Sequence, residues 1–197
     1  MGPRGFTVIE LVMVLVLVAI LAAVAAPMIF GGKGTLTVPA VAEKIADDLR
    51  YAQGLAMRRA NLETPAANNL LFRYRVRFNV ADANCSGADH YTIVNDEDGN
   101  GAWGEDPNGS GKVESARMPS DGSEYFCVRL NAGDYAGITA SADFGGTTPG
   151  ILAFDPLGTP YDSDGTRLAA ARTITVTDGT SSATITVTPN TGKVTVQ

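Results

Sequence analysis

The residues best suited to chemistry lie in the stretch 96–101, which reads Asp-Glu-Asp-Gly-Asn-Gly. Asp96, Asp98 and Asn100 offer oxygen ligands at alternating positions beside glycines, which is how an EF-hand type of loop begins to wrap calcium. The glutamate that would close such a loop is missing, because Pro107 occupies its position. Dense Asp, Asn and Gly are also typical of exposed turns, so a plain polar loop is the alternative. Calcium is therefore the one cofactor that the sequence suggests.

Residues for catalysis are scarce. His90 is the single histidine, and because it follows Asp89 in a polar stretch, we expect it at the surface. The sequence has no Gly-x-Ser-x-Gly elbow, no P-loop and no Cys-x-x-Cys pair. Asp155 and Glu124 are carboxylates that nothing in the sequence places in one cleft. The sequence therefore predicts that the protein is not an enzyme.

A glutamate stands near the start of a long apolar run. Glu10 is the one acidic residue in the stretch from Thr7 to Phe30, which has about the length that a helix needs to cross a bilayer, roughly 20 residues. Arg4 is the only charge before Glu10, so the positive-inside rule keeps the N-terminus cytoplasmic and exports the remainder. An ionisable residue inside a membrane span marks a functional site and needs a partner.

The residues around Glu10 read Arg4-Gly5, then Phe6-Thr7-Val8-Ile9-Glu10, ahead of the apolar run. This string resembles the N-terminus of the type IV pilin and type II secretion pseudopilin family. The resemblance implies that a prepilin peptidase cleaves between Gly5 and Phe6, and that the new amine of Phe6 is methylated. It also implies partners: other pilins or pseudopilins in a filament, an inner-membrane assembly platform and the inner membrane itself.

Simple electrostatics gives Glu10 a role consistent with this resemblance. Cleavage after Gly5 would create an ammonium group on Phe6, four residues before Glu10 and on the same helix face. Opposite charges attract strongly where the dielectric is low, and each is costly if left alone. We therefore interpret Glu10 as an assembly residue that pairs within one chain or between neighbours. The alternative is a secretory signal peptide cut after residues 23–25, which would release a soluble domain.

Composition and cysteines set further bounds. The 197 residues carry a formal net charge of −6, and the isoelectric point is near 4.7, so nucleic acid is not expected as a partner. Cys85 and Cys127 are the only cysteines. In an oxidising compartment such a pair most simply forms a disulfide, with two free buried thiols as the alternative. One histidine is too few for a structural zinc site with two cysteines.

Hydrophobic periodicity predicts the elements that position these residues. Val41, Ile45 and Leu49 continue as a stripe through residue 56, so residues 39–60 should form an amphipathic helix with one face on a sheet. Residues 71–80 alternate strictly between apolar side chains and Arg or Asn, which predicts a strand. We expect its arginine face to be solvated and paired with nearby acids, rather than to bind an anion.

The rest of the chain is β-rich. Residues 81–124 are polar and Gly-rich, with one short strand candidate at 91–95. Further strands are predicted at 125–130, 137–140, 151–154, 173–177, 183–188 and 193–196. The last three alternate β-branched residues with threonines and have turn residues between them, so they should form an antiparallel meander.

Three stretches resemble one branch of the pilin family. They are Asp48-Leu49-Arg50-Tyr51-Ala52-Gln53, Phe154-Asp155-Pro156-Leu157-Gly158, and residues 187–194 with the sequence Val-Thr-Pro-Asn-Thr-Gly-Lys-Val. These resemble the pseudopilin H (GspH), FimT and MshC-like minor pilin group. Members of that group that bind DNA use basic residues near the C-terminus. Here only Lys193 is basic, so we do not expect this chain to bind DNA.

Together these features predict an α+β, pilin-like fold with a long N-terminal transmembrane and amphipathic helix packed on an antiparallel β-sheet domain. We expect a prepilin leader at 1–5, a transmembrane assembly helix at 6–30, a linker and amphipathic helix at 31–60, and an extracytoplasmic β-rich domain at 61–197. The expected function is a minor pilin or pseudopilin, held in the inner membrane with its C-terminal domain in the periplasm and then built into a type IV pilus or type II secretion pseudopilus. The alternative is a membrane-anchored or secreted adhesive, ligand-binding β domain.

Overall fold

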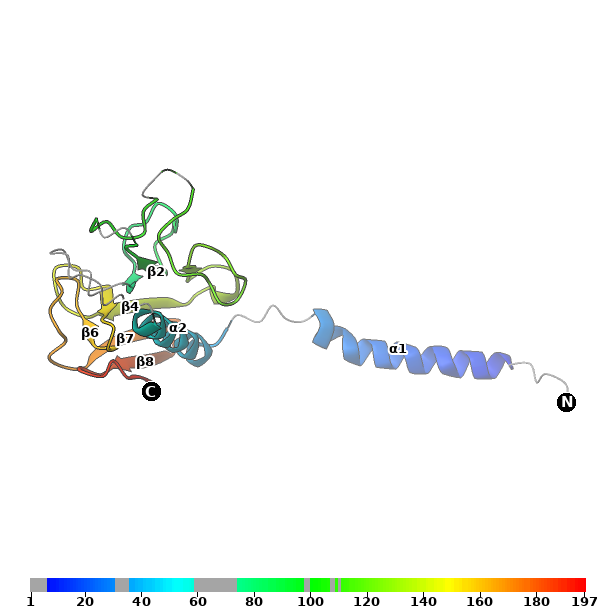
Figure 1. The fold of residues 1–197 in the computed structure, drawn as a ribbon. Helices are drawn as coiled ribbons and strands as arrows, with labels where there is room; N and C mark the ends of the chain where they lie inside the picture. The colour runs from blue at the N-terminus through cyan, green and yellow to red at the C-terminus, as the bar shows by residue number, and fades with distance from the viewer. Residues whose placement is uncertain (1–6, 31–35, 59–73, 98–99, 107–108, 110) are drawn as a thin grey trace. The chain divides into compact units, whose positions relative to one another are not determined.

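The fold is that of a computed structural model, which describes residues 7–30, 36–58, 74–97, 100–106, 109 and 111–197 (Figure 1). The chain divides into two compact units, Met1–Thr35 and Leu36–Gln197. Gly5, Phe6 and Asp98 lie outside the described residues.

The described residues of the first unit form the helix α1 (Val8–Phe30). Thr7 precedes it, and its carbonyl oxygen accepts hydrogen bonds from the backbone N–H groups of Glu10 at 3.1 Å and Leu11 at 3.2 Å. The large apolar side chains described along α1, from Val8 to Leu21, are 48% to 80% exposed. Within the described parts of the chain, no helix has the combined length and apolarity needed to cross a membrane.

In its described residues, the second unit has one α-helix and two antiparallel sheets. The helix is α2 (Val38–Arg58). The first sheet has the order β3-β2-β1-β5-β6 and consists of Cys127–Arg129, His90–Asn95, Tyr74–Phe78, Ile151–Phe154 and Pro160–Tyr161. The second has the order β4-β7-β8-β9 and consists of Thr139–Asp143, Arg172–Thr177, Ser182–Val187 and Val194–Val196. A short 3-10 helix, η1 (Gly133–Tyr135), precedes β4. The α+β class is confirmed.

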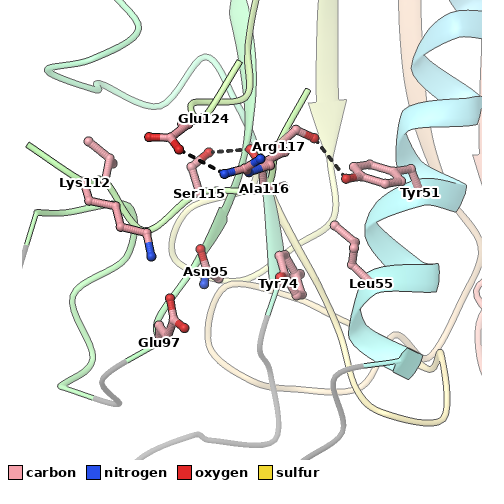
Figure 2. Close-up of a pocket in the computed structure, with 11 residues that line it drawn as sticks. Tyr51, Leu55, Tyr74, Asn95, Glu97, Lys112, Ser115, Ala116, Arg117 and Glu124 are labelled. Atoms are coloured by element: carbon pink, nitrogen blue, oxygen red, sulfur yellow. Dashed lines mark hydrogen bonds and ion pairs between the residues drawn. The ribbon is translucent and has the colours of Figure 1, made fainter. Parts of the chain in front are cut away.

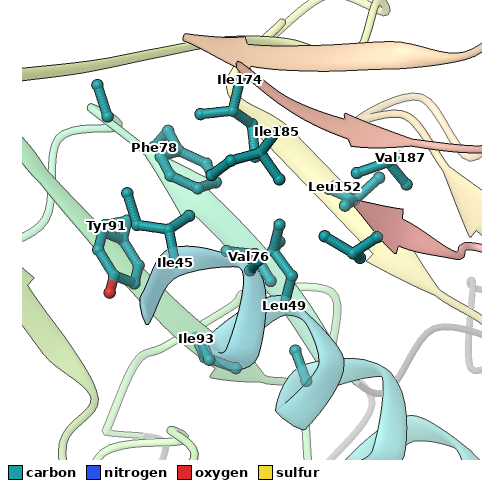
Figure 3. Close-up of a cluster of buried hydrophobic side chains, with 14 of the residues drawn as sticks. Ile45, Leu49, Val76, Phe78, Tyr91, Ile93, Leu152, Ile174, Ile185 and Val187 are labelled. Atoms are coloured by element: carbon teal, nitrogen blue, oxygen red, sulfur yellow. The ribbon is translucent and has the colours of Figure 1, made fainter. Parts of the chain in front are cut away.

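Helix α2 lies against both sheets. It contacts β1 and β5 of the first sheet and β7, β8 and β9 of the second. Its apolar stripe is buried as the periodicity predicts, with Ile45 and Leu49 at 0% exposure. Figure 3 shows these two side chains among Val76 of β1 and Ile185 of β8. One hydrophobic core therefore joins the helix to both sheets.

The C-terminal meander is confirmed. β7 pairs with β8 and β8 pairs with β9, both antiparallel. Asp178 closes the first turn, since its carboxylate accepts the backbone N–H groups of Thr180 at 2.8 Å and Ser181 at 2.7 Å. Strand β4 extends this sheet, because it pairs with the edge of β7 that lies opposite β8.

The arginine face of β1 is only partly solvated, because Arg75 and Arg77 are half-buried while Asn79 is exposed. The guanidinium carbon of Arg75 lies 3.9 Å from the ring centroid of Trp103. Arg77 pairs with Asp82, donates a hydrogen bond to the carbonyl oxygen of Trp103, and has a side chain only 12% exposed. Burial lowers the pKa of Arg75, an effect that nearby Asp96 opposes. Trp103, which follows β2, thus covers part of this face, and the expected pairing with an acid is present for Arg77.

A disulfide joins Cys85 to Cys127, with the two Cα atoms 5.7 Å apart. Cys85 lies in the loop between β1 and β2, and Cys127 begins β3. The bridge therefore closes the segment that carries β2 and the polar stretch after it.

Candidate functional site

Glu10 lies in the first turn of α1. Its backbone N–H is held by Thr7, whose hydroxyl oxygen lies at 3.3 Å, and the Glu10 residue is exposed. An acidic residue in the first turn is favoured by the positive end of the helix dipole. The structure therefore leaves this carboxylate open to a partner, while the proposed partner residue, Phe6, lies outside the described residues.

The acidic loop is held by its own hydrogen bonds. Asp96 is 7% exposed, and its carboxylate accepts the N–H of Gly101 at 3.0 Å. Asn100 accepts the N–H of Ala102 at 2.6 Å and donates to Glu105. Among the described residues, no three His, Cys, Asp or Glu side chains lie close enough together to hold a metal ion. Because Asp98 is not described, calcium binding by Asp96, Asp98 and Asn100 stays a prediction.

His90 is buried, so its expected place at the surface was wrong. The residue is 3% exposed and begins β2. Its ring nitrogens lie 3.0 Å from the carbonyl oxygen of Gly87 and 2.9 Å from that of Val80. A neutral imidazole can donate only one of these two hydrogen bonds. The ring holds the loop between β1 and β2 in place, which is a structural role that the surrounding polar sequence did not reveal.

The carboxylate of Asp155 also holds a turn. It is buried and accepts hydrogen bonds from the backbone N–H groups of Leu157 at 2.9 Å and Thr159 at 2.7 Å, and from the hydroxyl of Tyr161 at 3.2 Å. Glu124, by contrast, is exposed and pairs with Arg117 at 3.0 Å. Each acid thus has separate partners.

The segment Asp48–Gln53 of α2 fastens the helix to several elements at once. Asp48 accepts a 2.5 Å hydrogen bond from Tyr91 of β2 and pairs with Lys44 at 2.7 Å. Arg50 donates to the carbonyl oxygen of Val194 in β9 at 3.0 Å. The polar face of α2 therefore makes defined contacts with β2 and β9, in addition to the contacts that its apolar stripe makes with the core.

Gln53 links α2 to two turns. Its side-chain nitrogen donates to the carbonyl oxygens of Gly158 at 2.8 Å and Thr191 at 2.9 Å. The turns approach so closely that a Cβ on Gly192 would lie 2.5 Å from the carbonyl oxygen of Gly158. Gly192 also has a φ of +61°, which favours glycine. The three stretches that resemble the GspH, FimT and MshC-like group therefore meet at one point.

A pocket of about 420 Å³ lies beside α2 at the end of β2. Figure 2 shows Tyr51 and Leu55 of α2 on one side and Glu97 and Lys112 on the other, with Asn95 between them. The other lining residues are Tyr74, Val113, Ser115, Ala116, Arg117 and Glu124. No local sequence pattern predicts this pocket, because its walls come from segments far apart in the chain.

Comparison with known proteins identifies one motif. The family described as the prokaryotic N-terminal methylation motif matches residues 1–26. No curated protein and no solved structure matches the chain. The motif covers Glu10 and ends within α1, so the Leu36–Gln197 unit lies outside it. Residues 1–26 are therefore similar to the N-terminal methylation motif, which supports a prepilin-like N-terminus of the type IV pilin kind.

Proposed function

We propose that the chain is a minor pilin or pseudopilin of the GspH, FimT and MshC-like group, which assembles into a type IV pilus or a type II secretion pseudopilus. A prepilin peptidase cleaves it after Gly5, and the amine of Phe6 is methylated. α1 then holds the subunit in the inner membrane, with the Leu36–Gln197 unit in the periplasm, until the assembly platform adds it to a filament.

The match of residues 1–26 to the N-terminal methylation motif carries this proposal. The exposure of α1 supports it. Large apolar side chains that are 48% to 80% exposed need a cover, and lipid or the α1 helices of neighbouring subunits supply one. Glu10 breaks this apolar surface once, in the first turn. The placement of one acid there is what a charge pair with the amine of Phe6 requires.

The assignment to the branch rests on the three stretches that resemble it. Gln53 contacts Gly158 and Thr191, so the three stretches pack together although they lie in separate parts of the chain.

The test begins with the N-terminus of the mature protein, read by mass spectrometry. A methylated Phe6 is the expected result. A chain that begins at Ala26 would mean that a signal peptidase releases a soluble domain, and would overturn the proposal.

Glu10→Ala then tests assembly. The variant should insert and be processed normally, because removing a charge from the span makes insertion easier. Its amount in sheared filaments should fall, since the amine of Phe6 loses its counter-ion. Glu43→Ala is the matched control, because Glu43 is an exposed glutamate on α2. Wild-type amounts of Glu10→Ala in filaments would contradict the assembly role of Glu10.

A further inference from the structure

Asn95 is a polar residue at the end of an apolar row. Tyr91, Ile93 and Asn95 alternate along β2, and alternate residues of a strand share one face of the sheet. Tyr91 is 1% exposed and Ile93 is 0% exposed, both within the core that α2 covers. Asn95 is 6% exposed and lies opposite Tyr74 of β1, where the row reaches the pocket.

The side-chain oxygen of Asn95 has no hydrogen-bond partner among the described residues. A buried acceptor without a donor is destabilising, and in a folded protein such a group calls for an explanation. Asn95 lines the pocket, but its oxygen is itself covered, so the amide must turn toward the pocket before a ligand there can supply the missing O–H or N–H group (Figure 2).

The walls restrict the chemistry of that ligand. Tyr51 and Leu55 are one helical turn apart on α2 and present a ring and an aliphatic side chain to the same side of the pocket (Figure 2). Ala116 adds to this apolar surface. The ligand therefore needs an apolar face as well as a donor group.

The charged residues of the lining balance one another. Glu97 and Glu124 oppose Lys112 and Arg117, and the Arg117–Glu124 ion pair has a separation of 3.0 Å. A ligand with a net charge gains little from such a lining, since attraction to one sign is offset by repulsion from the other. Neutral ligands are favoured.

We propose that this pocket binds one ring of a neutral sugar. A hydroxyl of the sugar donates to the side-chain oxygen of Asn95, and the C–H face of the ring lies against Tyr51 and Leu55. Sugars combine hydroxyl donors with an apolar face, as these walls require, and the volume of about 420 Å³ falls within the range of small-molecule sites. The site lies wholly within the Leu36–Gln197 unit, so the proposal goes beyond filament assembly and does not depend on it.

The test uses the full-length chain in phosphocholine detergent micelles, because sugar-based detergents would compete. The probes are the methyl glycosides of glucose, galactose, mannose and N-acetylglucosamine, and ligand-observed NMR measures Kd. At least one probe should bind saturably. Asn95→Leu should weaken its binding at least about fivefold, because one hydrogen bond is lost. The melting temperature of this variant should stay the same or rise, since the unpaired acceptor is gone.

Asn84→Leu is the matched control, because Asn84 is exposed and does not line this pocket. It should bind the probe as the wild type does. If Asn95→Leu folds poorly, Leu55→Trp provides a second test, because it fills the pocket from α2 and should abolish binding. The proposal is overturned if no probe binds saturably or if both pocket variants bind normally. It is equally overturned if N-acetylalanine methylamide binds in an Asn95-dependent way and the sugars do not, which would make this a peptide site.

Discussion

Gln53→Ala tests whether one side chain holds α2 to the two turns that contain Gly158 and Thr191. The wild-type amide donates two hydrogen bonds, at 2.8 Å and 2.9 Å. A neutral hydrogen bond contributes about 0.5–1.5 kcal/mol, and the lower half of this range applies here because Gln53 is only half buried. The variant should therefore lose about 1.5 kcal/mol of unfolding free energy. For a chain of this size the loss corresponds to a melting temperature lower by roughly 3–6 °C.

Gln53→Glu distinguishes the loss of the two hydrogen bonds from a loss of side-chain packing. The glutamate keeps the shape of the side chain but turns the donor into a carboxylate that faces two carbonyl oxygens. At pH 7 it should destabilise the unit more than alanine does, because repulsion adds to the lost hydrogen bonds. Below about pH 4 the carboxyl group gains a proton and can donate again, so the difference between the two variants should shrink.

The assay is thermal and urea unfolding of the full-length chain in micelles, followed by circular dichroism at pH 7 and pH 4. Gln197→Ala and Gln197→Glu are matched controls, because Gln197 is exposed and hydrogen-bonds to Thr184 through its backbone. Both controls should shift the midpoint by less than about 0.5 kcal/mol. Equal stability of Gln53→Ala and Gln53→Glu at pH 7 would refute the reasoning.

Three further predictions concern the same unit. Burial, together with Asp48, raises the pKa of Tyr91 well above its ordinary value of 10.0, so the unfolded chain loses this proton at lower pH than the folded one. Stability should therefore fall as the pH rises above about 10, and Tyr91→Phe should flatten this decline in urea midpoints measured from pH 8 to pH 11. Replacing Cys85 and Cys127 with serine should lower the unfolding free energy by about 4 kcal/mol, and reductant should do the same to the wild type but not to the variant. If the acidic loop holds calcium, millimolar calcium should raise the melting temperature of the wild type more than magnesium does, and should not raise that of Asp98→Ala; indifference to both calcium and chelator would leave a plain polar loop.

Local periodicity was enough to identify most elements of the Leu36–Gln197 unit. The stripe through Ile45 and Leu49 predicted α2, and alternation predicted β1 and the C-terminal meander. These signals work because a helix or strand that covers a core must repeat its apolar residues with its own period. The two-residue strand β6 (Pro160–Tyr161) was missed, since so short a segment has no period. The N-terminal motif was likewise readable from sequence, because its residues are consecutive.

Only the tertiary structure decided what the polar residues do. The pattern placed Arg75 and Arg77 together on one face of β1, but the cover over that face comes from Trp103 and Asp82, which the strand pattern does not include. His90 lies in a polar stretch and is nevertheless buried, since its ring is held by carbonyl oxygens of a neighbouring loop. The pocket at Asn95 is formed by segments that meet only after folding. Sequence periodicity reports which side of an element is apolar, whereas the partner of a polar group depends on long-range packing that no local pattern encodes.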